Sequence, residues 1–163
     1  MAVTSDVIVG FPGETEEEFM ETYNFINEHK FSELHVFPYS KRTGTPAARM
    51  EDQVDEEVKN DRVHRLISLS DQLAKEYASQ FDGEVLEVIP EEVSNDEAGS
   101  GNLMGYTDNY MKVIFAASED LIGKIVKVKI TKAGYPHNEG QFVKVVADLV
   151  SKAELFMEEE AAI

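Results

Sequence analysis

The sequence predicts an α+β protein in which the C-terminal piece of an incomplete α/β barrel precedes a small all-β barrel. Two observations lead to this prediction. In the first half of the chain, apolar strands are followed by glycine turns or polar loops and then by helices with one apolar face. After Gly83 the pattern changes to short strands in which apolar and polar residues alternate. We therefore expect two strands and helices of the barrel over 1–82, a β-barrel over 83–150 and an acidic tail over 151–163.

The first strand and its turn lie in Asp6–Thr15, with the sequence DVIVGFPGET. The β-branched run predicts a strand buried on both faces. Gly10 and Gly13 allow a sharp turn that can come close to a ligand. Thr15 and Glu18 have the spacing of a capping box, which predicts that a helix begins here. This strand end is where barrel enzymes bind their ligands.

The glycine turn at Gly10–Gly13 could also be an ordinary turn without a ligand, since glycine-rich turns are common in α/β proteins. A P-loop is excluded, because that motif places a lysine on the phosphates after its last glycine. Here Glu14 follows Gly13 and would repel a phosphate. A ligand site and an ordinary turn therefore both stay open from the pattern alone.

A second apolar strand is predicted over Leu34–Ser40, followed by a polar loop over Lys41–Arg49. Loops on a rigid scaffold often carry binding residues, although an ordinary connection with solvated arginines is the alternative. The spacing of apolar residues then predicts a helix over Val54–Phe81. We expect this helix to pack against the barrel, with His64 and Arg65 solvated.

Four short strands are predicted after Gly83: Glu84–Ile89, Tyr110–Phe115, Ile125–Ile130 and Phe142–Val146. Such strands predict an OB-like barrel, a fold that binds single-stranded nucleic acid through a basic groove and stacking aromatic rings. The residues expected to supply both are Tyr106, Tyr110, Lys112, Lys127, Lys129, Lys144, Tyr135 and Phe142. Alternating lysines can instead serve only to protect strand edges and solvate a face. The acidic stretch Glu91–Asn102 is expected to be a mobile hairpin loop.

Three motifs in this order resemble the radical-SAM methylthiotransferases that act on tRNA. The first is Asp6–Thr15, the second is FPYSxRxGTPAA over Phe37–Ala48, and the third is GYTDNYMKV over Gly105–Val113. The third motif is similar to the C-terminal TRAM domain of that family, and the resemblance covers Thr4–Val150. It is strongest to the branch that modifies threonylcarbamoyladenosine beside the anticodon, and the isopentenyladenosine branch is the alternative.

The resemblance implies a transferase whose chemistry depends on residues outside this chain. In the family, one iron–sulfur cluster cleaves S-adenosylmethionine to a radical that abstracts hydrogen from C2 of the adenine. A second cluster takes part in supplying sulfur, and another S-adenosylmethionine gives the methyl group. Cluster iron needs thiolate ligands, and this chain contains no cysteine. We therefore expect no catalytic or metal-binding residue here, no cofactor held by this chain alone and no catalysis by it alone.

The resemblance also implies which residues line S-adenosylmethionine in the full-length enzyme. By their places in the first two motifs these are Val9, Gly10, Glu14, Phe37, Tyr39 and Ser40. Val9 and Gly10 would lie next to the adenine, the glycine because a side chain there would block it. Arg42 and Arg49 would meet the substrate nucleotide or the cofactor carboxylate, and Arg42 is counted among the RNA-binding residues. The expected partner is the tRNA anticodon stem–loop.

Charge limits how this chain can bind RNA. The sequence has 15 basic and 32 acidic residues and a net charge of −17, which opposes general phosphate binding. RNA contact is therefore expected to be local, through the lysines of one face. Two classes without catalysis stay open: a stand-alone RNA-binding module, and an acidic domain that binds a basic protein.

Location and assembly follow from simpler features. No apolar run approaches the ~20 residues of a membrane span, and no signal peptide is visible, so we expect a cytoplasmic protein without a membrane partner. The four histidines show no metal-ligand spacing. A barrel that lacks its preceding strand has an open edge, which predicts self-association through Asp6–Val9.

Overall fold

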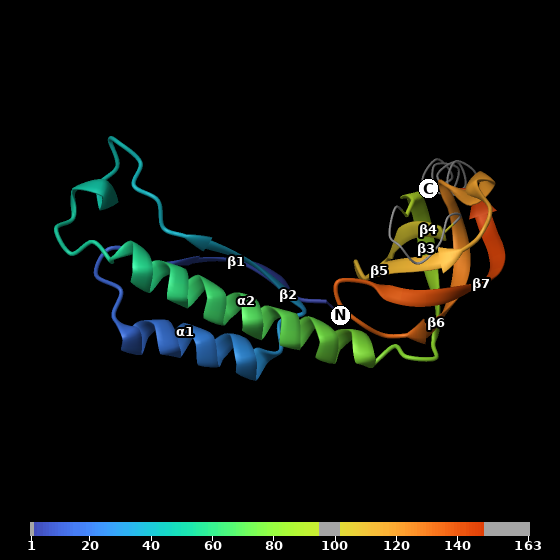
Figure 1. Cartoon of the computed structure of the whole chain (residues 1–163), viewed down its shortest axis with the longest axis horizontal. Coiled ribbons are helices and arrows are strands. Elements are labelled where there is room, and N and C mark those ends of the chain that lie inside the picture. The colour runs from blue at the N-terminus through green and yellow to red at the C-terminus, as the bar shows by residue number, and fades with distance from the viewer. Residues whose placement is uncertain (1, 95–101, 149–163) are drawn as a thin grey trace, which may run out of the picture. The chain divides into compact units, whose positions relative to one another are not determined.

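The computed structural model describes residues 2–94 and 102–148. The elements, in chain order, are β1 (Thr4–Val9), α1 (Glu16–His29), β2 (Glu33–Pro38), η1 (Ala47–Arg49), α2 (Glu56–Ser79), β3 (Val85–Val93), β4 (Asn102–Thr107), β5 (Lys112–Ala116), η2 (Glu119–Leu121), β6 (Lys124–Lys132) and β7 (Asn138–Asp148) (Figure 1). The chain divides into two compact units, Met1–Tyr77 and Ala78–Ile163. The predicted acidic tail and most of the predicted loop at 91–102 lie outside the described residues.

The first unit is a pair of parallel strands with both helices on the same side of them (Figure 1). β1 and β2 pair in register from Thr4 opposite Glu33 to Val9 opposite Pro38. Alternate side chains of both strands point at the helices and form one core with them. The buried members of this core are Val9, Phe19, Ile26, Leu34, Leu66, Leu69 and Leu73.

The prediction of a first strand buried on both faces is wrong for this structure. Val9 is 1% exposed, whereas its neighbour Ile8 is 60% exposed, and Phe37, opposite Ile8 in β2, is 50% exposed. The helices α1 and α2 cover one face only, and no described element covers the other. The β-branched run correctly predicted a strand, but it could not show whether one or both faces of that strand are covered by other elements.

Local sequence signals set the helices, as predicted. Glu18 N–H donates to Thr15 Oγ1 at 3.2 Å, and Thr15 N–H donates to Glu18 Oε2 at 2.9 Å, which completes the capping box of α1. Phe19 and Ile26 are buried along the apolar face of this helix. Helix α2 begins one residue after Asp55, inside the predicted span. Among the described residues, no helix is both long enough and apolar enough to cross a membrane.

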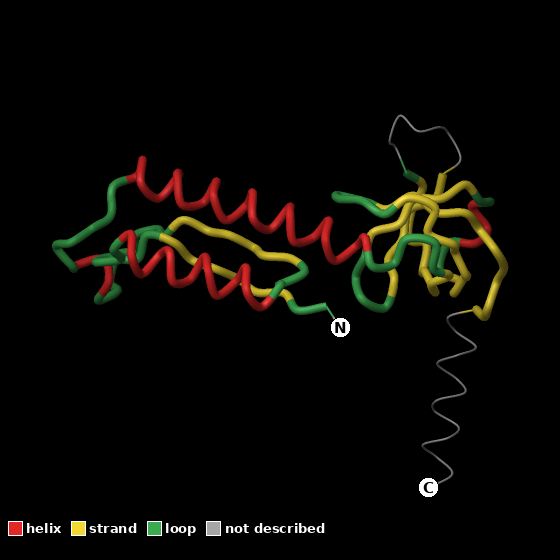
Figure 2. Tube along the Cα trace, turned by 90° about the horizontal axis from the view of Figure 1, so that it is seen from below, coloured by secondary structure: helices red, strands yellow, loops and turns green. Residues whose placement is uncertain are grey.

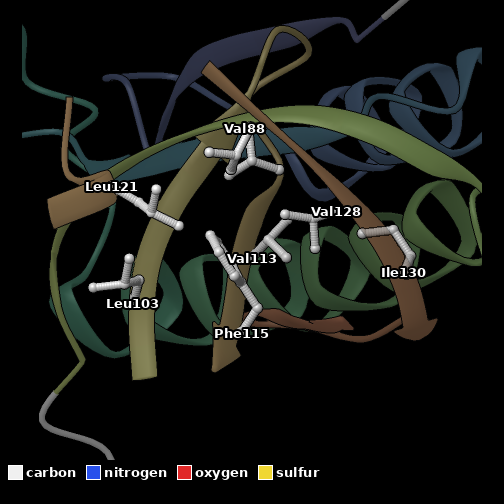
Figure 3. Packing of buried hydrophobic residues seen from close by; sticks show 8 residues of the cluster. Val88, Leu103, Val113, Phe115, Leu121, Val128 and Ile130 are labelled. Atoms are coloured by element: carbon white, nitrogen blue, oxygen red, sulfur yellow. The ribbon is translucent and has the colours of Figure 1, made fainter. Parts of the chain in front are cut away.

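The second unit is a closed barrel of five strands in the order β3-β4-β5-β7-β6 (Figure 2). Only the β5–β7 pair is parallel. Alternate residues of each strand fill the interior, where side chains from different strands meet (Figure 3). The buried members of this core are Val88, Leu103, Val113, Phe115, Leu121, Val126, Val128 and Ile130.

The barrel confirms the four predicted strands and adds one that was missed, β4. Gly105 lies in the middle of β4. In the structure it pairs with Pro90 of the neighbouring strand β3, next to a bulge between Pro90 and Glu92. A Cβ on Gly105 would lie 2.2 Å from the carbonyl oxygen of Ile89. The glycine is therefore needed for close approach of two strands and not for a turn.

Candidate functional site

The uncovered face of β1 and β2 borders a cavity of about 690 Å³. Its lining residues are Asp6, Ile8, Phe37, Pro38, Tyr39, Ser40, Arg42, Thr45 and Ala47. The volume lies within the range of roughly 300–1,000 Å³ found for small-molecule sites. The lining is also typical of such sites, because apolar rings and chains stand beside a few polar groups.

The structure brings together part of the predicted cofactor-binding set. Phe37, Tyr39 and Ser40 line the cavity, and so does Arg42. The other three residues lie behind the cavity lining: Val9 and Gly10 are buried, and Glu14 is hydrogen-bonded within the β1–α1 turn. These three are connected to the cavity through the backbone, since Tyr39 N–H donates to the carbonyl oxygen of Val9 at 2.8 Å.

Tyr39 has the clearest unused hydrogen-bonding group of the cavity. Its hydroxyl is buried and has no hydrogen-bond partner among the described residues. Its ring meets the edge of Phe11, with ring centroids 5.3 Å apart. A buried hydroxyl without a partner costs free energy.

Sequence reasoning missed two buried cations of α2, Lys59 and Arg62. Both lie on the apolar face of the helix, because they precede the buried Leu66 by seven and four residues. That spacing was the available signal. Arg62 binds the Glu14 carboxylate at 2.6 Å, and Lys59 donates to the carbonyl oxygen of Tyr39 at 3.2 Å. His64 is exposed, as predicted, and Arg65 is half-buried beside Glu16 and Phe19.

The predicted RNA-binding residues of the barrel lie in rows on its outer surface. Lys127 of β6 is opposite Lys144 of β7, and Tyr106 of β4 is opposite Lys112 of β5. Lys129 follows Lys127 on the same side of β6, while the valines and isoleucine between and beside them fill the interior. The predicted alternation of this strand is confirmed.

The lysines of the barrel differ in whether an acid neutralises them. Lys132 binds Glu139 at 2.5 Å, and Lys124 lies 3.9 Å from Asp120. The hydrogen bond from Lys132 lowers the pKa of the Glu139 carboxyl. The other barrel lysines, within 102–148, form no ion pair: Lys112, Lys127, Lys129 and Lys144. The four lysines predicted to meet RNA are therefore the ones whose charge is available to a partner.

Tyr110 is held in an unusual backbone conformation and points into solvent. Its φ is +62°, and the residue is 80% exposed. The turn is fixed on both sides, because Tyr110 N–H donates to the Thr107 carbonyl oxygen at 3.0 Å and Met111 N–H donates to Thr107 Oγ1 at 3.0 Å. A bulky residue with positive φ is an outlier that often marks a functional site. Tyr135 is also partly exposed, whereas Phe142 packs against the barrel core.

Comparison with known proteins covers both units. Residues 80–134 match the model of the TRAM domain. The chain is 78% identical over 152 residues, 93% of its length, to the threonylcarbamoyladenosine tRNA methylthiotransferase of Bacillus subtilis, of which this covers 34%. Over nearly its whole length, the chain is therefore similar to part of a tRNA methylthiotransferase. The chain spans about a third of the length of the curated relatives it matches.

Two further relatives carry the name tRNA-2-methylthio-N(6)-dimethylallyladenosine synthase. The protein of Acetivibrio thermocellus is 46% identical over 88% of this chain and 30% of its own length. The protein of Aquifex aeolicus is 39% identical over 90% of this chain and 32% of its own length. The resemblance found in the three motifs is thus confirmed, and the identity is higher to the threonylcarbamoyladenosine enzyme than to these two synthases.

Proposed function

We propose that this chain is part of a radical-SAM enzyme that methylthiolates C2 of threonylcarbamoyladenosine next to the tRNA anticodon. The observation that carries the proposal is the 78% identity, over nearly the whole chain, to a methylthiotransferase of that specificity. The identities of 46% and 39% to dimethylallyladenosine synthases make the isopentenyladenosine reaction the alternative. An enzyme acting on tRNA is expected in the cytoplasm.

The first unit is, in this proposal, the C-terminal piece of the radical-SAM barrel. Parallel sheets are normally covered on both faces, and a two-stranded sheet is marginal without further packing. Here the pair β1–β2 leaves Ile8 and Phe37 exposed on one face. Further parallel strands, closing around that face, would turn the exposed apolar side chains into the interior of a barrel.

S-adenosylmethionine fits the residues that border the cavity. Phe37 and Tyr39 offer rings for the adenine, and Ser40 offers hydrogen bonds. Val9, Gly10 and Glu14 would form the backbone turn beside the adenosyl group. When bound, S-adenosylmethionine supplies the radical and the methyl group of the family's reaction.

The iron–sulfur clusters do not fit this chain. The sequence has no cysteine, and within 2–94 and 102–148 no three acidic or histidine side chains are grouped so that they could hold a metal ion. We therefore assign to this chain the binding and orientation of S-adenosylmethionine and tRNA and no step of the redox chemistry.

The barrel is proposed to bind the tRNA anticodon stem–loop through its outer rows. Lys112, Lys127, Lys129 and Lys144 would meet phosphates, and Tyr106 and Tyr110 would stack on unpaired bases. Arg42, exposed at the wall of the cavity, is placed to meet the substrate nucleotide.

Nucleoside mass spectrometry of tRNA tests the reaction directly. Deleting the gene should remove 2-methylthio-threonylcarbamoyladenosine and leave threonylcarbamoyladenosine in its place. Loss of the methylthiolated isopentenyladenosine instead would establish the alternative. A strain that retains both methylthiolated nucleosides would contradict the proposal.

We also propose that the isolated 163-residue chain self-associates through β1. Within the described part of the chain, β1 pairs with β2 alone, so its other edge carries unpaired backbone groups. Light scattering should show a mass above the 18.3 kDa of a monomer, increasing with concentration. A monodisperse monomer at high concentration would speak against this.

A further inference from the structure

Two buried cations of α2 contact the segments with which β1 and β2 end. Arg62 is 4% exposed and Lys59 is 5% exposed, three residues apart on one helix face. Burying an ammonium or guanidinium costs several kcal/mol unless it is well paired, and an apolar side chain would pack a helix at lower cost. The partners of these two cations therefore decide what they do.

Arg62 fixes the turn after β1 through Glu14. Its Nη1 donates to Glu14 Oε2 at 2.6 Å and to the Glu14 carbonyl oxygen at 3.1 Å. The same Oε2 accepts the Gly10 N–H at 2.6 Å. One carboxylate thus connects the first residue after β1, the turn itself and the helix.

Lys59 fixes the end of β2 and contacts the same glycine. Its Nζ donates to the Tyr39 carbonyl oxygen at 3.2 Å and to Glu56 Oε1 at 2.5 Å. A Cβ at Gly10 would lie 2.1 Å from Lys59 Cγ, so the lysine stem fills the space beside the glycine backbone. Lys59 therefore touches both strand ends.

The network is not arranged for stability alone. Arg62 Nε is buried without a hydrogen-bond partner among the described residues, its nearest carboxylate oxygen, Glu16 Oε2, lying 3.5 Å away. The Tyr39 hydroxyl is buried and unpaired as well. Buried polar atoms without a partner are uncommon in folded proteins. The hydrogen-bonding capacity of Arg62 and Tyr39 is therefore not fully used within the described residues.

We propose that Lys59 and Arg62 are positioning residues for the ligand of the strand-end cavity. They hold the Gly10–Glu14 turn and the backbone of Tyr39, and through these the side chains of Tyr39 and Ser40 that line the cavity. Neither cation is among the residues that line the cavity. The identity of the ligand as S-adenosylmethionine rests on the proposed function.

The test compares Arg62→Gln and Lys59→Met with Arg65→Gln in the full-length protein. Arg65 is a matched control, because it lies on the same helix and also binds Glu16, at 2.7 Å, without touching the two strand ends. The rate of amide hydrogen exchange over residues 10–15 and 38–40 measures how firmly the backbone of these two segments is held. Isothermal titration measures the affinity for S-adenosylmethionine. The thermal midpoint of unfolding measures global stability, so that the two effects can be separated.

Both test variants should speed amide exchange at these turns and weaken S-adenosylmethionine binding about tenfold, which corresponds to about 1.4 kcal/mol for a site that is no longer held in place. The control should change neither. Arg62→Lys, which keeps the charge, should recover part of the affinity. If Arg62→Gln does not fold, Glu14→Gln removes the same ion pair while keeping an acceptor for Gly10 N–H, and the same readouts apply.

Unchanged exchange at both turns, or unchanged affinity in folded variants, would overturn the inference. Failure of the proposed function looks different. In that case the wild-type protein itself does not bind S-adenosylmethionine, while the exchange at residues 10–15 and 38–40 still decides whether the two cations hold the turns.

Discussion

The two units differ in where some of their cations lie and what these cations bind. In the first unit, Arg62 and Lys59 are buried and bound to acids, and the exposed Lys30 is also paired, with Glu76 at 3.0 Å. In the barrel, Lys127 and Lys144 stand opposite each other and unpaired on the surface. A chain with a net charge of −17 can therefore still carry neighbouring lysines without an ion pair on one surface.

The units differ in the same way in their apolar surface. The barrel closes on itself and buries its core from every strand. The first unit buries one face of its sheet and exposes Ile8 and Phe37 on the other. The barrel thus covers its own core, whereas the first unit leaves apolar side chains exposed on one face of its sheet.

Gly105→Ala should have the largest effect, and it should be confined to the barrel. The added Cβ would meet the Ile89 carbonyl oxygen at 2.2 Å, so β3 and β4 must separate. We expect a loss of about 3 kcal/mol in the free energy of unfolding, the upper end for overpacking. Urea unfolding followed by circular dichroism measures it.

Gly134→Ala is the matched control, because the nearest atom to its added Cβ, the His137 carbonyl oxygen, is 3.1 Å away. It should cost less than about 1 kcal/mol. Equal losses in the two variants would mean that β3 and β4 lie further apart at Gly105 than the structure places them.

Charge reversal of two outer lysines should have the second-largest effect, and this effect is on tRNA binding. Lys127→Glu combined with Lys129→Glu places two acids where phosphates are expected, and tRNA affinity of the full-length enzyme at low salt should fall about 30-fold, roughly 2 kcal/mol. Filter binding across a salt series measures the affinity, and its slope should become shallower.

The control for this pair is Lys124→Glu with Lys132→Glu, on the same strand, where both lysines are already bound to acids. It should weaken tRNA binding much less. Unchanged affinity in the test variant would remove the lysine face from the proposal.

Tyr110→Ala should have a smaller effect on binding and almost none on folding. The ring is 80% exposed, and one base stacked on an aromatic ring contributes ~1–3 kcal/mol. We expect about tenfold weaker tRNA binding, and Tyr110→Phe should bind like the wild type, since stacking needs the ring and not the hydroxyl. If alanine binds as tightly as phenylalanine, the exposed ring has another role.

The smallest effect concerns the paired lysine Lys132. Its hydrogen bond lowers the pKa of Glu139, so the pair stabilises the fold above the unfolded-state pKa of that carboxyl and loses this effect as the pH falls through the lowered value. Lys132→Gln should return the pKa of Glu139 toward its usual range, as seen by NMR titration. A carboxyl that titrates identically in both proteins would show that the pair does not persist in solution.

Local patterns predicted the elements, and long-range contacts set what the sequence could not show. The capping box at Thr15 and the alternation at Lys127 and Lys129 depend on neighbouring residues, so they were readable. The need for Gly105 comes from the backbone of β3, and the burial of Arg62 comes from Glu14, 48 residues away. A helix cation is ordinarily solvated, so the spacing of Arg62 from Leu66 could place it on the apolar face but could not identify its partner.

The contact between Gly10 and Lys59 has a consequence for how this protein can diverge. Gly10 has a φ of +73°, and the Lys59 stem occupies the space in which a side chain would begin. A larger residue at position 10 would have to tolerate that backbone and would also require a shorter residue at position 59. A substitution of Gly10 should therefore survive in a descendant only together with a shorter residue at position 59.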